Sequence, residues 1–290
     1  MVHRRNFIKQ TGLALVACSI APGFSFTTKE KESLGIQLYS LRETISQNPK
    51  EILRKLANIG FNEIETYGYN DGKFWGLSVA ELKEELTKNN LTSPSGHYDG
   101  NSLIKGDFEN FKEIISVANQ LDQKYIIIPS IAENLRGSKS DYLNIAEKFN
   151  KAGEMCKSAG ITLAYHNHAF EFEKMDNTTG YDILLNNTDE DLVTFEMDIY
   201  WVVRAGINPI SLFKKYPGRF KLWHVKDMHT EDPELNTEIG SGSIEYKEIF
   251  KNAEISGVEH YILEQENFEI PAFQSLEKSY SYLQNKVSIN

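Results

Sequence analysis

The stretch Ile161-Thr-Leu-Ala-Tyr-His-Asn-His168 begins as an apolar, β-prone segment and ends in polar residues. Three later segments have the same form, and each turns polar at a His, Asp or Glu: Phe195-Glu-Met-Asp198, Leu222-Trp-His224-Val-Lys226 and Tyr261-Ile-Leu-Glu264-Gln-Glu266. Successive segments lie roughly thirty residues apart, which is the length of one strand–helix unit. Parallel strands whose carboxyl ends carry imidazoles and carboxylates can build a metal site at the mouth of a barrel. We therefore expect these four segments to be barrel strands that share one site.

The rest of the chain alternates between strand-like and helix-like segments in the same way. Strands are expected at 34–40, 61–67, 92–97, 124–129, 161–168, 193–198, 220–225 and 259–264. Helices are expected at 49–59, 78–90, 106–122, 140–159, 181–187, 209–216, 243–256 and 271–284. Gly60, Gly160 and Gly257 follow predicted helices, where a left-handed residue can end them. This order predicts an α/β fold, a single (β/α)8 TIM barrel over residues 34–290; a doubly wound open sheet is the alternative.

Composition and missing motifs exclude several classes of function. The first predicted strand is not followed by Gly-x-Gly-x-x-Gly, and the sequence has no phosphate-loop motif, which weakens dinucleotide or nucleotide binding. A formal net charge of −10 argues against a nucleic-acid partner, because a phosphate-binding surface needs a basic patch. An apolar content of 40% is enough for the core of an ordinary globular protein.

The N-terminal residues read as an export signal. His3-Arg-Arg-Asn-Phe-Ile-Lys9 precedes a short apolar run and resembles a twin-arginine signal; a basic amphipathic start is the alternative. Leu15-Val-Ala-Cys18 resembles a bacterial lipobox, in which Cys18 would carry a lipid anchor, although ordinary cleavage would also fit. Residues 1–26 are interpreted as the signal, with the lipobox and the start of a linker, and 27–33 as the linker. We expect an exported protein, periplasmic or membrane-anchored as a lipoprotein.

Alternation along each strand predicts which polar side chains lie together, because residues two apart point to the same face. His166 and His168 share a face, as do Glu196 with Asp198, His224 with Lys226, and Glu264 with Glu266. A core hydrogen bond or an ion pair would explain any one of these residues. Their recurrence on four strands favours a divalent metal site shared by the four strand ends. Mixed nitrogen and oxygen ligands suit Mn²⁺, Zn²⁺, Co²⁺ or Fe²⁺ better than Ca²⁺.

Asp198, His224 and Glu264, together with the run Glu238-Ile-Gly-Ser-Gly242-Ser-Ile-Glu-Tyr246, resemble the xylose isomerase-like TIM-barrel superfamily. More narrowly, residues 34–283 resemble the sugar phosphate isomerases/epimerases, a family that includes tagatose epimerases and inosose dehydratases. This resemblance implies a divalent metal bound at the strand ends by His166 or His168, Asp198, His224 and Glu264, and a polyhydroxylated or keto-sugar substrate that binds its open positions.

The chain departs from that family at the fifth strand. The epimerases carry a glutamate there, and this sequence has Ala164, so that His166 or His168 would replace the missing ligand. Those epimerases use glutamates of the fifth and eighth strands as two opposed bases. Without the first glutamate, one metal and a single base are expected, which also suits elimination from, or hydration of, a keto-sugar.

The expected chemistry is removal of a proton beside a polarised carbonyl or hydroxyl. The candidates for the catalytic groups are His168, Glu171 and Lys226; Lys226 could equally be an ordinary ion-pair partner. Other strand-end and aromatic residues are expected to bind substrate hydroxyls or stack on the sugar: Glu65, His97, Trp201 and Tyr39.

Three functions compete on this evidence. The first is an exported metal-dependent isomerase or epimerase acting on a small-molecule sugar or keto-sugar. The second is a keto-sugar or keto-glycoside lyase or hydratase using the same metal site. The third is a sugar-binding lipoprotein without turnover. A metal-dependent endonuclease would need the basic surface that the sequence lacks. An oligomer is compatible with all of these and is left open.

Overall fold

The computed structural model describes residues 33–287. The predicted signal at 1–26, Cys18 and nearly all of the predicted linker at 27–33 lie outside the described residues. Within residues 33–287, none of the helices is both long enough and apolar enough to cross a lipid bilayer.

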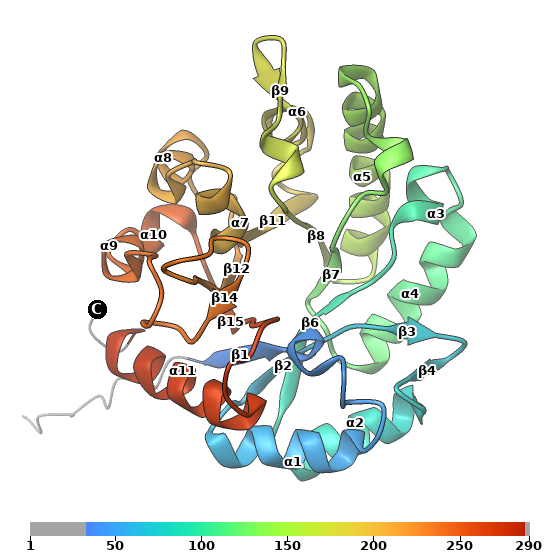
Figure 1. The fold of residues 1–290 in the computed structure, drawn as a ribbon. Helices are drawn as coiled ribbons and strands as arrows, with labels where there is room; N and C mark the ends of the chain where they lie inside the picture. The colour runs from blue at the N-terminus through green and yellow to red at the C-terminus, as the bar shows by residue number, and fades with distance from the viewer. Residues whose placement is uncertain (1–32, 288–290) are drawn as a thin grey trace, which may run out of the picture. The chain divides into compact units, whose positions relative to one another are not determined.

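Eight parallel strands close into one barrel, as predicted (Figure 1). Around the barrel the neighbours are β1 (Leu34–Gln37), β2 (Glu63–Thr66), β6 (Thr92–His97), β7 (Tyr125–Ile128), β8 (Thr162–His166), β11 (Val193–Asp198), β12 (Leu222–Val225) and β15 (His260–Leu263). β15 pairs with β1 and completes the closure. The β2–β6 register shifts between Glu63 and Glu65, opposite the segment that contains Pro94. A bulge of this kind accommodates a proline inside a sheet.

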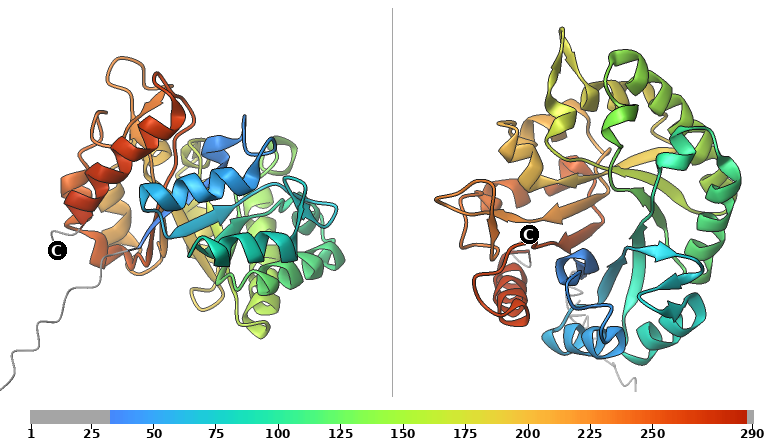
Figure 2. Two further views of the ribbon diagram at one scale, coloured as in Figure 1. Left: turned by 90° about the horizontal axis from the view of Figure 1, so that it is seen from below. Right: turned by 45° about the vertical axis from the view of Figure 1, so that its right-hand side comes forward.

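Helices surround the barrel (Figures 1 and 2). Their bounds are α1 Pro49–Ile59, α2 Val79–Lys88, α3 Asn101–Ile104, α4 Phe108–Gln120, α5 Lys139–Ser158, α6 Gly180–Asn187, α7 Ile199–Arg204, α8 Pro209–Lys215, α9 Tyr246–Phe250, α10 Ala253–Ser256 and α11 Ala272–Val287. The single helix predicted over 243–256 is therefore two short helices. Asn252 lies between them, and its side-chain amide donates to the Glu248 carbonyl at 2.9 Å, which competes with regular helix geometry.

Side-chain caps explain where two of the helices begin. Asn48 accepts from the Glu51 backbone N–H at the start of α1, and Pro49 occupies the first turn, where a missing N–H costs nothing. Ser78 and Glu81 form a capping box at the start of α2, which begins within the predicted range 78–90. The first strand is shorter than predicted, because the Gln37 side chain accepts from Tyr39 N and starts the 3₁₀ turn η1 (Leu38–Leu41). This turn carries Tyr39.

Two hydrophobic clusters fix the orientation of the strands. The larger one lies between the strands and the helices, and the smaller one consists of Tyr125, Ile127, Ala164, Leu222 and Ile262. In the smaller cluster, Ala164, Leu222 and Ile262 each lie two residues before a polar residue at the end of the same strand. Alternation therefore stacks a polar layer directly on an apolar layer.

The loops that follow the barrel strands carry small antiparallel sheets. One is a three-stranded sheet in the order β3 (Tyr69–Asn70), β4 (Lys73–Phe74) and β5 (Leu77–Ser78). The other two are the pairs β9 (Lys174–Met175) with β10 (Thr178–Thr179) and β13 (Asp227–Met228) with β14 (Asn236–Thr237). Short 3₁₀ turns occur at η2 (Glu133–Leu135) and η3 (Phe170–Phe172). These loops follow strand carboxyl ends, so they surround one mouth of the barrel.

One carboxylate organises the glycine-rich loop after β12. Asp227 accepts hydrogen bonds from the backbone N–H groups of Gly240 at 2.8 Å and of Gly242 and Ile244 at 3.1 Å. A Cβ atom at position 242 would collide with Asp227 Oδ1 and with the Met228 carbonyl. Glycine is therefore required there for the close approach of backbone and carboxylate.

The collision at position 242 predicts that Gly242→Ala lowers the free energy of unfolding by about 1–3 kcal/mol, the usual cost of overpacking. Urea unfolding curves would measure this loss. Gly137→Ala is the matched control, because a Cβ at position 137 meets only Asp141 Oδ2 at an ordinary 3.8 Å. Equal stability of the two variants would contradict the expectation.

Candidate metal centre

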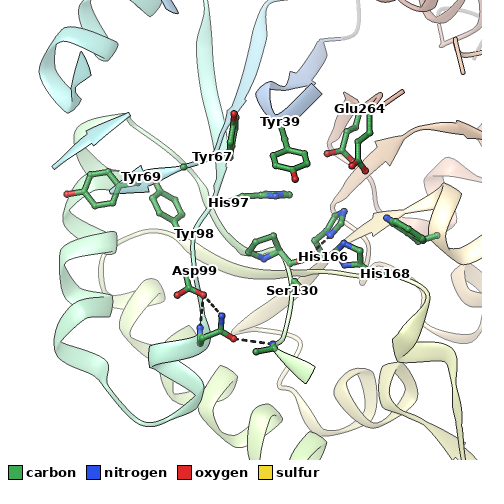
Figure 3. A pocket seen from close by; sticks show the side chains of 16 residues that line it. Tyr39, Tyr67, Tyr69, His97, Tyr98, Asp99, Ser130, His166, His168 and Glu264 are labelled. Atoms are coloured by element: carbon green, nitrogen blue, oxygen red, sulfur yellow. Dashed lines mark hydrogen bonds between the residues drawn. The ribbon is translucent and has the colours of Figure 1, made fainter. Parts of the chain in front are cut away.

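Four predicted ligands meet at the polar layer of the barrel. Each of four adjacent strands contributes one: His166 from β8, Asp198 from β11, His224 from β12, and Glu264 directly after β15. One ligand atom from each of them lies within 4.8 Å of the others, and all four residues are buried. Figure 3 shows His166 and Glu264 at the cavity they border. Of the two histidines predicted as alternatives, His166 belongs to this group.

The hydrogen bonding of His166 fixes which ring nitrogen faces the centre. His166 Nδ1 lies 3.2 Å from the Pro129 carbonyl oxygen, which can only accept, so Nδ1 carries the proton. The lone pair of Nε2 then points at Asp198 Oδ2, 3.5 Å away. Both atoms are buried and neither has a hydrogen-bond partner among the described residues. Two buried acceptors without donors are expected where a cation belongs.

The His224 ring contacts the metal centre through one nitrogen and two further carboxylates through the other. Its Nδ1 lies 3.2 Å from Glu264 Oε2 and 3.9 Å from Asp198 Oδ2. Its Nε2 lies 2.7 Å from Glu65 Oε1 and 3.2 Å from Glu196 Oε2. Carboxylates that hold the outer nitrogen of a metal-binding histidine fix its tautomer and orientation. Nδ1 is thus the nitrogen available to the metal.

Lys226 supplies positive charge beside the ligands. Its ammonium lies 3.2 Å from Glu264 Oε2 and 4.0 Å from Asp198 Oδ2, and it also pairs with Glu266. Burial opposes a charged lysine, but the three carboxylates raise the pKa of Lys226. Burial likewise opposes ionisation of Glu264, but Lys226 and His224 hold the pKa of Glu264 well below its usual range. The ligand carboxylates are therefore ionised.

The donor set fits a first-row divalent metal. Two imidazole nitrogens and two carboxylate oxygens suit Zn²⁺, Mn²⁺, Fe²⁺ or Co²⁺, whereas Ca²⁺ prefers oxygen alone. A second group of possible ligands, formed by Glu65, His97, Glu196 and His224, lies alongside. In this second group the shortest nitrogen–oxygen distances are 2.7 to 2.9 Å, which are hydrogen-bond distances. Protons therefore already lie between the histidine nitrogens and the carboxylate oxygens.

A cavity of about 530 Å³ opens over the metal centre. Four residues predicted to act on or bind the substrate line it: Tyr39, His97, His168 and Trp201. Burial and the neighbouring His166 lower the pKa of His168 to about 3, so its imidazole is neutral. His168 Nδ1 is buried and has no hydrogen-bond partner among the described residues. It is therefore an unoccupied proton acceptor or donor at the cavity wall.

Three residues predicted to bind substrate or to act in catalysis do not line the cavity. Glu65, expected to bind substrate, is fully buried and accepts hydrogen bonds from Gln37 and Ser95 as well as from the histidines. Glu171, expected to act in catalysis, is buried in the η3 turn and accepts hydrogen bonds from Tyr165 OH and from His168 N at 2.9 Å. Both carboxylates position other site residues. Lys226, the third catalytic candidate, reaches the ligands but does not line the cavity.

Burial raises the pKa of Glu171 to about 7 from an ordinary 4.5, against the lowering effect of its hydrogen bonds from Tyr165 and the backbone. The folded state therefore holds a proton that the unfolded chain has lost between pH 4.5 and about 7. The free energy of unfolding falls with rising pH across that window, because the native state binds more protons there. At about 1.4 kcal/mol per pKa unit, the fall is on the order of 3 kcal/mol.

The Glu171→Gln variant cannot ionise, so its unfolding free energy is expected to depend less on pH than that of the parent. Urea unfolding at pH 5 and at pH 8, in the presence of EDTA, would measure the difference. Asp191→Asn, at an exposed carboxylate, serves as the control. A slope as steep in Glu171→Gln as in the parent would show that Glu171 does not titrate in this window.

Two positioning residues were not predicted for the site. Glu196 lies 2.7 Å from His97 Nε2, and strand alternation did place its side chain on the face of Asp198. Asn167 bridges the ends of β8 and β11: its Oδ1 accepts from Asp198 N at 3.2 Å, and its Nδ2 donates to the Asp198 carbonyl at 3.3 Å. Nothing in the local sequence around Asn167 distinguishes it from a loop asparagine.

Comparisons with known proteins agree with this geometry. The family model described as "Xylose isomerase-like TIM barrel" matches residues 53–286. Inosose dehydratase from Clostridium beijerinckii is 24% identical over 272 residues, which cover 82% of this chain and 89% of that protein. A crystal structure described as a sugar phosphate isomerase/epimerase from Parabacteroides distasonis has a TM-score of 0.79 and 30% identity, over 89% of this chain and 95% of that one. A structure described as the IOLI protein with a binding zinc atom has a TM-score of 0.71 at 14% identity, over 88% and 98%, a likeness of fold alone.

Proposed function

This chain belongs to the xylose isomerase-like TIM barrel family, and from that premise we propose that it is a metal-dependent enzyme acting on a sugar or keto-sugar. The proposed reaction starts with removal of a proton from a carbon next to a carbonyl or hydroxyl group. Its outcome is isomerisation or epimerisation. The small-molecule substrate would enter through the cavity above the metal centre.

The observation that carries this proposal is a pair of buried atoms, His166 Nε2 and Asp198 Oδ2, that face each other beside His224 and Glu264 and have no hydrogen-bond partner in residues 33–287. Leaving two such atoms without donors costs stability, about 1–3 kcal/mol for each atom. A cation bound between the two atoms would offset that loss of stability. The same centre adjoins a cavity lined by aromatic and polar side chains, as a site for a small polar ligand requires.

The residues around the metal centre have separate roles in the proposed reaction. A divalent ion held by His166, Asp198, His224 and Glu264 would polarise a substrate oxygen and stabilise negative charge on it. His168 Nδ1 is free to accept or return a proton at the cavity wall. Lys226 balances the carboxylate charges from behind. Tyr39 and Trp201 lie on the walls and limit how a ring can sit.

A second outcome, loss of water or of a leaving group, is favoured by one specific observation. The ligand from β8 is the imidazole of His166, and Ala164 lies in the apolar layer beneath it. A pair of opposed glutamate bases is thus not available from β8 and β15. A single base suits elimination, and a relative with the printed name inosose dehydratase supports this alternative. A binding protein without turnover would show neither outcome.

Metal removal tests the proposal directly. EDTA-treated protein is expected to lose all exchange of carbon-bound hydrogen when a panel of keto-sugars is incubated in deuterated water. Adding back Mn²⁺ or Zn²⁺ is expected to restore exchange, which mass spectrometry would detect as incorporated deuterium. The products distinguish the outcomes, because an epimer keeps the substrate mass apart from deuterium, whereas a dehydration product lacks water. Restored metal without exchange on any sugar would leave only a binding protein.

Export is proposed from the N-terminal sequence alone. Arg4 and Arg5 precede the short apolar run, and Cys18 follows it. Fractionation of cells that express the full chain, compared with a variant carrying Arg4→Lys and Arg5→Lys, would test export through the twin-arginine route. Mass spectrometry of the mature N-terminus would show whether Cys18 is lipidated.

A further inference from the structure

The cavity extends well beyond the metal centre. His166 and Glu264 lie at one end, and Tyr69, Tyr98 and Asp99 lie at the other, on the segments that follow β2 and β6 (Figure 3). Its volume of about 530 Å³ exceeds the space that one pyranose ring fills. The far end is therefore room that a single sugar bound at the metal would leave empty.

Two tyrosine rings form a wall of this far end. Tyr98 OH donates to Gln123 Oε1 at 2.7 Å, and Tyr69 OH donates to Glu113 Oε1 at 2.7 Å. The ring centroids lie 6.3 Å apart in a T-shaped arrangement. Because both hydroxyls are already bonded to the protein, the half-buried Tyr69 ring offers the cavity its carbon surface, and the buried Tyr98 ring supports it from behind. Such surfaces pack against the C–H faces of a sugar ring.

A carboxylate stands beside these rings. Asp99 Oδ1 accepts from Asn101 N at 3.1 Å and from Asn101 Nδ2 at 2.6 Å, which holds the side chain in place. Asp99 is exposed, so its second oxygen is accessible. A fixed carboxylate oxygen accepts hydrogen bonds from hydroxyl groups, and it repels an anion. This combination of aromatic surface and carboxylate favours an uncharged polyhydroxylated ligand.

The charge of the whole lining disfavours a phosphate group. The charged residues that line the cavity are Asp99, Glu264 and Glu266, apart from any charge on the histidines. Among the described residues, no Lys or Arg lines it. A phosphate is normally held by Arg, Lys or a cluster of backbone N–H groups. Glu264 and Glu266 are paired with Lys226. The uncompensated carboxylate of the lining is therefore Asp99, and a phosphate at the far end would meet it without a Lys or Arg of the lining to bind it.

Basic side chains outside the lining are already engaged. Arg42 donates to the Glu266 carbonyl at 3.1 Å and lies over the Tyr39 ring. Arg136 donates to the Ile131 carbonyl at 2.9 Å, and its guanidinium lies 3.5 Å from the Phe170 ring centroid. Lys226 is buried between carboxylates. Recruiting any of them to a phosphate would break these contacts.

We propose that the far end of the cavity is a second sugar subsite, so that the substrate is an uncharged glycoside of two linked rings. The inference rests on the proposed function, since one ring must react at the metal centre while the other packs on Tyr69. Binding of the second ring would hold the first in its reactive orientation. The reacting ring would carry the keto group, and the second ring would determine specificity.

Calorimetry on the Mn²⁺-loaded full chain tests the subsite with defined probes. Cellobiose, maltose and trehalose serve as neutral two-ring sugars, glucose as the single ring, and glucose 6-phosphate as the charged single ring. At least one disaccharide is expected to bind about tenfold more tightly than glucose, the ratio that corresponds to about 1.4 kcal/mol. Glucose 6-phosphate is expected to bind no more tightly than glucose. Tightest binding of the phosphate, or no preference for any disaccharide, would overturn the proposal.

Two variants locate the effect at the far end. Tyr69→Ala is expected to reduce disaccharide affinity about tenfold more than glucose affinity, because it removes the packing surface. Tyr69→Phe keeps the ring and loses only the hydroxyl bonded to Glu113, so it should retain the preference. An equal loss for both sugars in Tyr69→Ala would contradict a separate subsite.

The exchange assay separates this inference from the proposed function. Proton exchange on keto-sugars without any disaccharide preference would refute the subsite and leave the enzyme. Disaccharide preference without exchange on any keto-sugar would refute the enzyme and leave a two-ring binding site.

Discussion

Replacing Asp198 with asparagine is expected to abolish metal binding while the barrel stays folded. Asp198 Oδ2 is buried without a hydrogen-bond partner among the described residues and faces His166 Nε2 at 3.5 Å. Asparagine has nearly the same shape, and its Oδ1 can still accept from Trp201 N, as Asp198 does at 3.1 Å to cap α7. Its amide nitrogen would stand where Oδ2 was and donate to His166 Nε2. In the variant, a hydrogen bond would therefore occupy the space that a cation occupies in the parent.

The expected loss of metal affinity is large, whereas the expected change in the stability of the metal-free protein is small. Substitution of outer-sphere groups around a metal already costs about 10–100-fold in affinity, so loss of a charged ligand should cost at least about a hundredfold. The metal-free variant gains a donor for His166 Nε2 but loses the negative charge that lies 4.0 Å from the Lys226 ammonium, so its unfolding free energy should fall by no more than about 3 kcal/mol relative to the metal-free parent. Metal stabilises the parent in proportion to the logarithm of its concentration over Kd. Thermal unfolding with EDTA and with added Zn²⁺ would show a rise in Tm for the parent alone.

Asp191→Asn provides the matched control for this experiment. It makes the same chemical change just before the opposite end of β11, at an exposed side chain. The control should keep both the metal content, measured by elemental analysis, and the metal-dependent rise in Tm. Stoichiometric metal in purified Asp198→Asn would show that the ion sits elsewhere and would remove the basis of the proposed enzyme.

The parts of the site that strand alternation determines were predictable from the sequence. His166, Asp198, His224 and Glu264 stand at or just after the ends of consecutive parallel strands, and parallel strands bring their carboxyl ends to one mouth. The period of two also placed Glu196 beside Asp198. The same local signals gave the capping box of α2, because the contact between Ser78 and Glu81 spans only three residues.

The roles of Glu65 and Glu171 could not be predicted from the sequence, because they depend on a contact across the barrel and on the direction of a short turn. Glu65 has the appearance of a strand-end residue that could face a ligand, but β2 stands across the barrel from β12, and there Glu65 meets His224. The partner lies 159 residues away in the chain, so no local pattern marks it. Glu171 faces away from the cavity because the η3 turn reverses the chain and directs its carboxylate to Tyr165. A turn of three residues carries too little periodicity to predict its direction.

Replacing Glu65 with glutamine is expected to weaken metal binding even though Glu65 is not a ligand. Glu65 is fully buried and its Oε1 lies 2.7 Å from His224 Nε2 and 2.9 Å from His97 Nε2. Its charge therefore favours the tautomer of His224 that carries a proton on Nε2 and leaves Nδ1 for the metal. A glutamine amide keeps the volume but supplies no negative charge. Metal affinity should fall about 10–100-fold, which competition with a fluorescent zinc chelator would measure.

The same substitution should also lower the unfolding free energy of the metal-free protein. Removing one partner of a buried charged pair costs about 3–5 kcal/mol, because the other partner remains buried. Burial opposes ionisation of Glu65, but His97 and His224 hold its pKa well below the usual value of 4.5. The stabilisation is therefore present above pH 4.5 and is lost as the pH falls. The deficit of Glu65→Gln relative to the parent should be full at pH 7 and should shrink in acid.

Glu63→Gln separates the effect on the metal from the effect on stability. Glu63 lies two residues earlier on β2, on the same face, and its Oε2 is 2.9 Å from His260 Nδ1, at the start of β15. The change is chemically identical and also breaks a contact between a carboxylate and a histidine, but at the opposite end of the barrel. Glu63→Gln should lose stability and keep its metal affinity, whereas Glu65→Gln should lose both. Equal metal affinity in the two variants would show that Glu65 does not orient His224, and that the charge beneath the metal centre serves the fold alone.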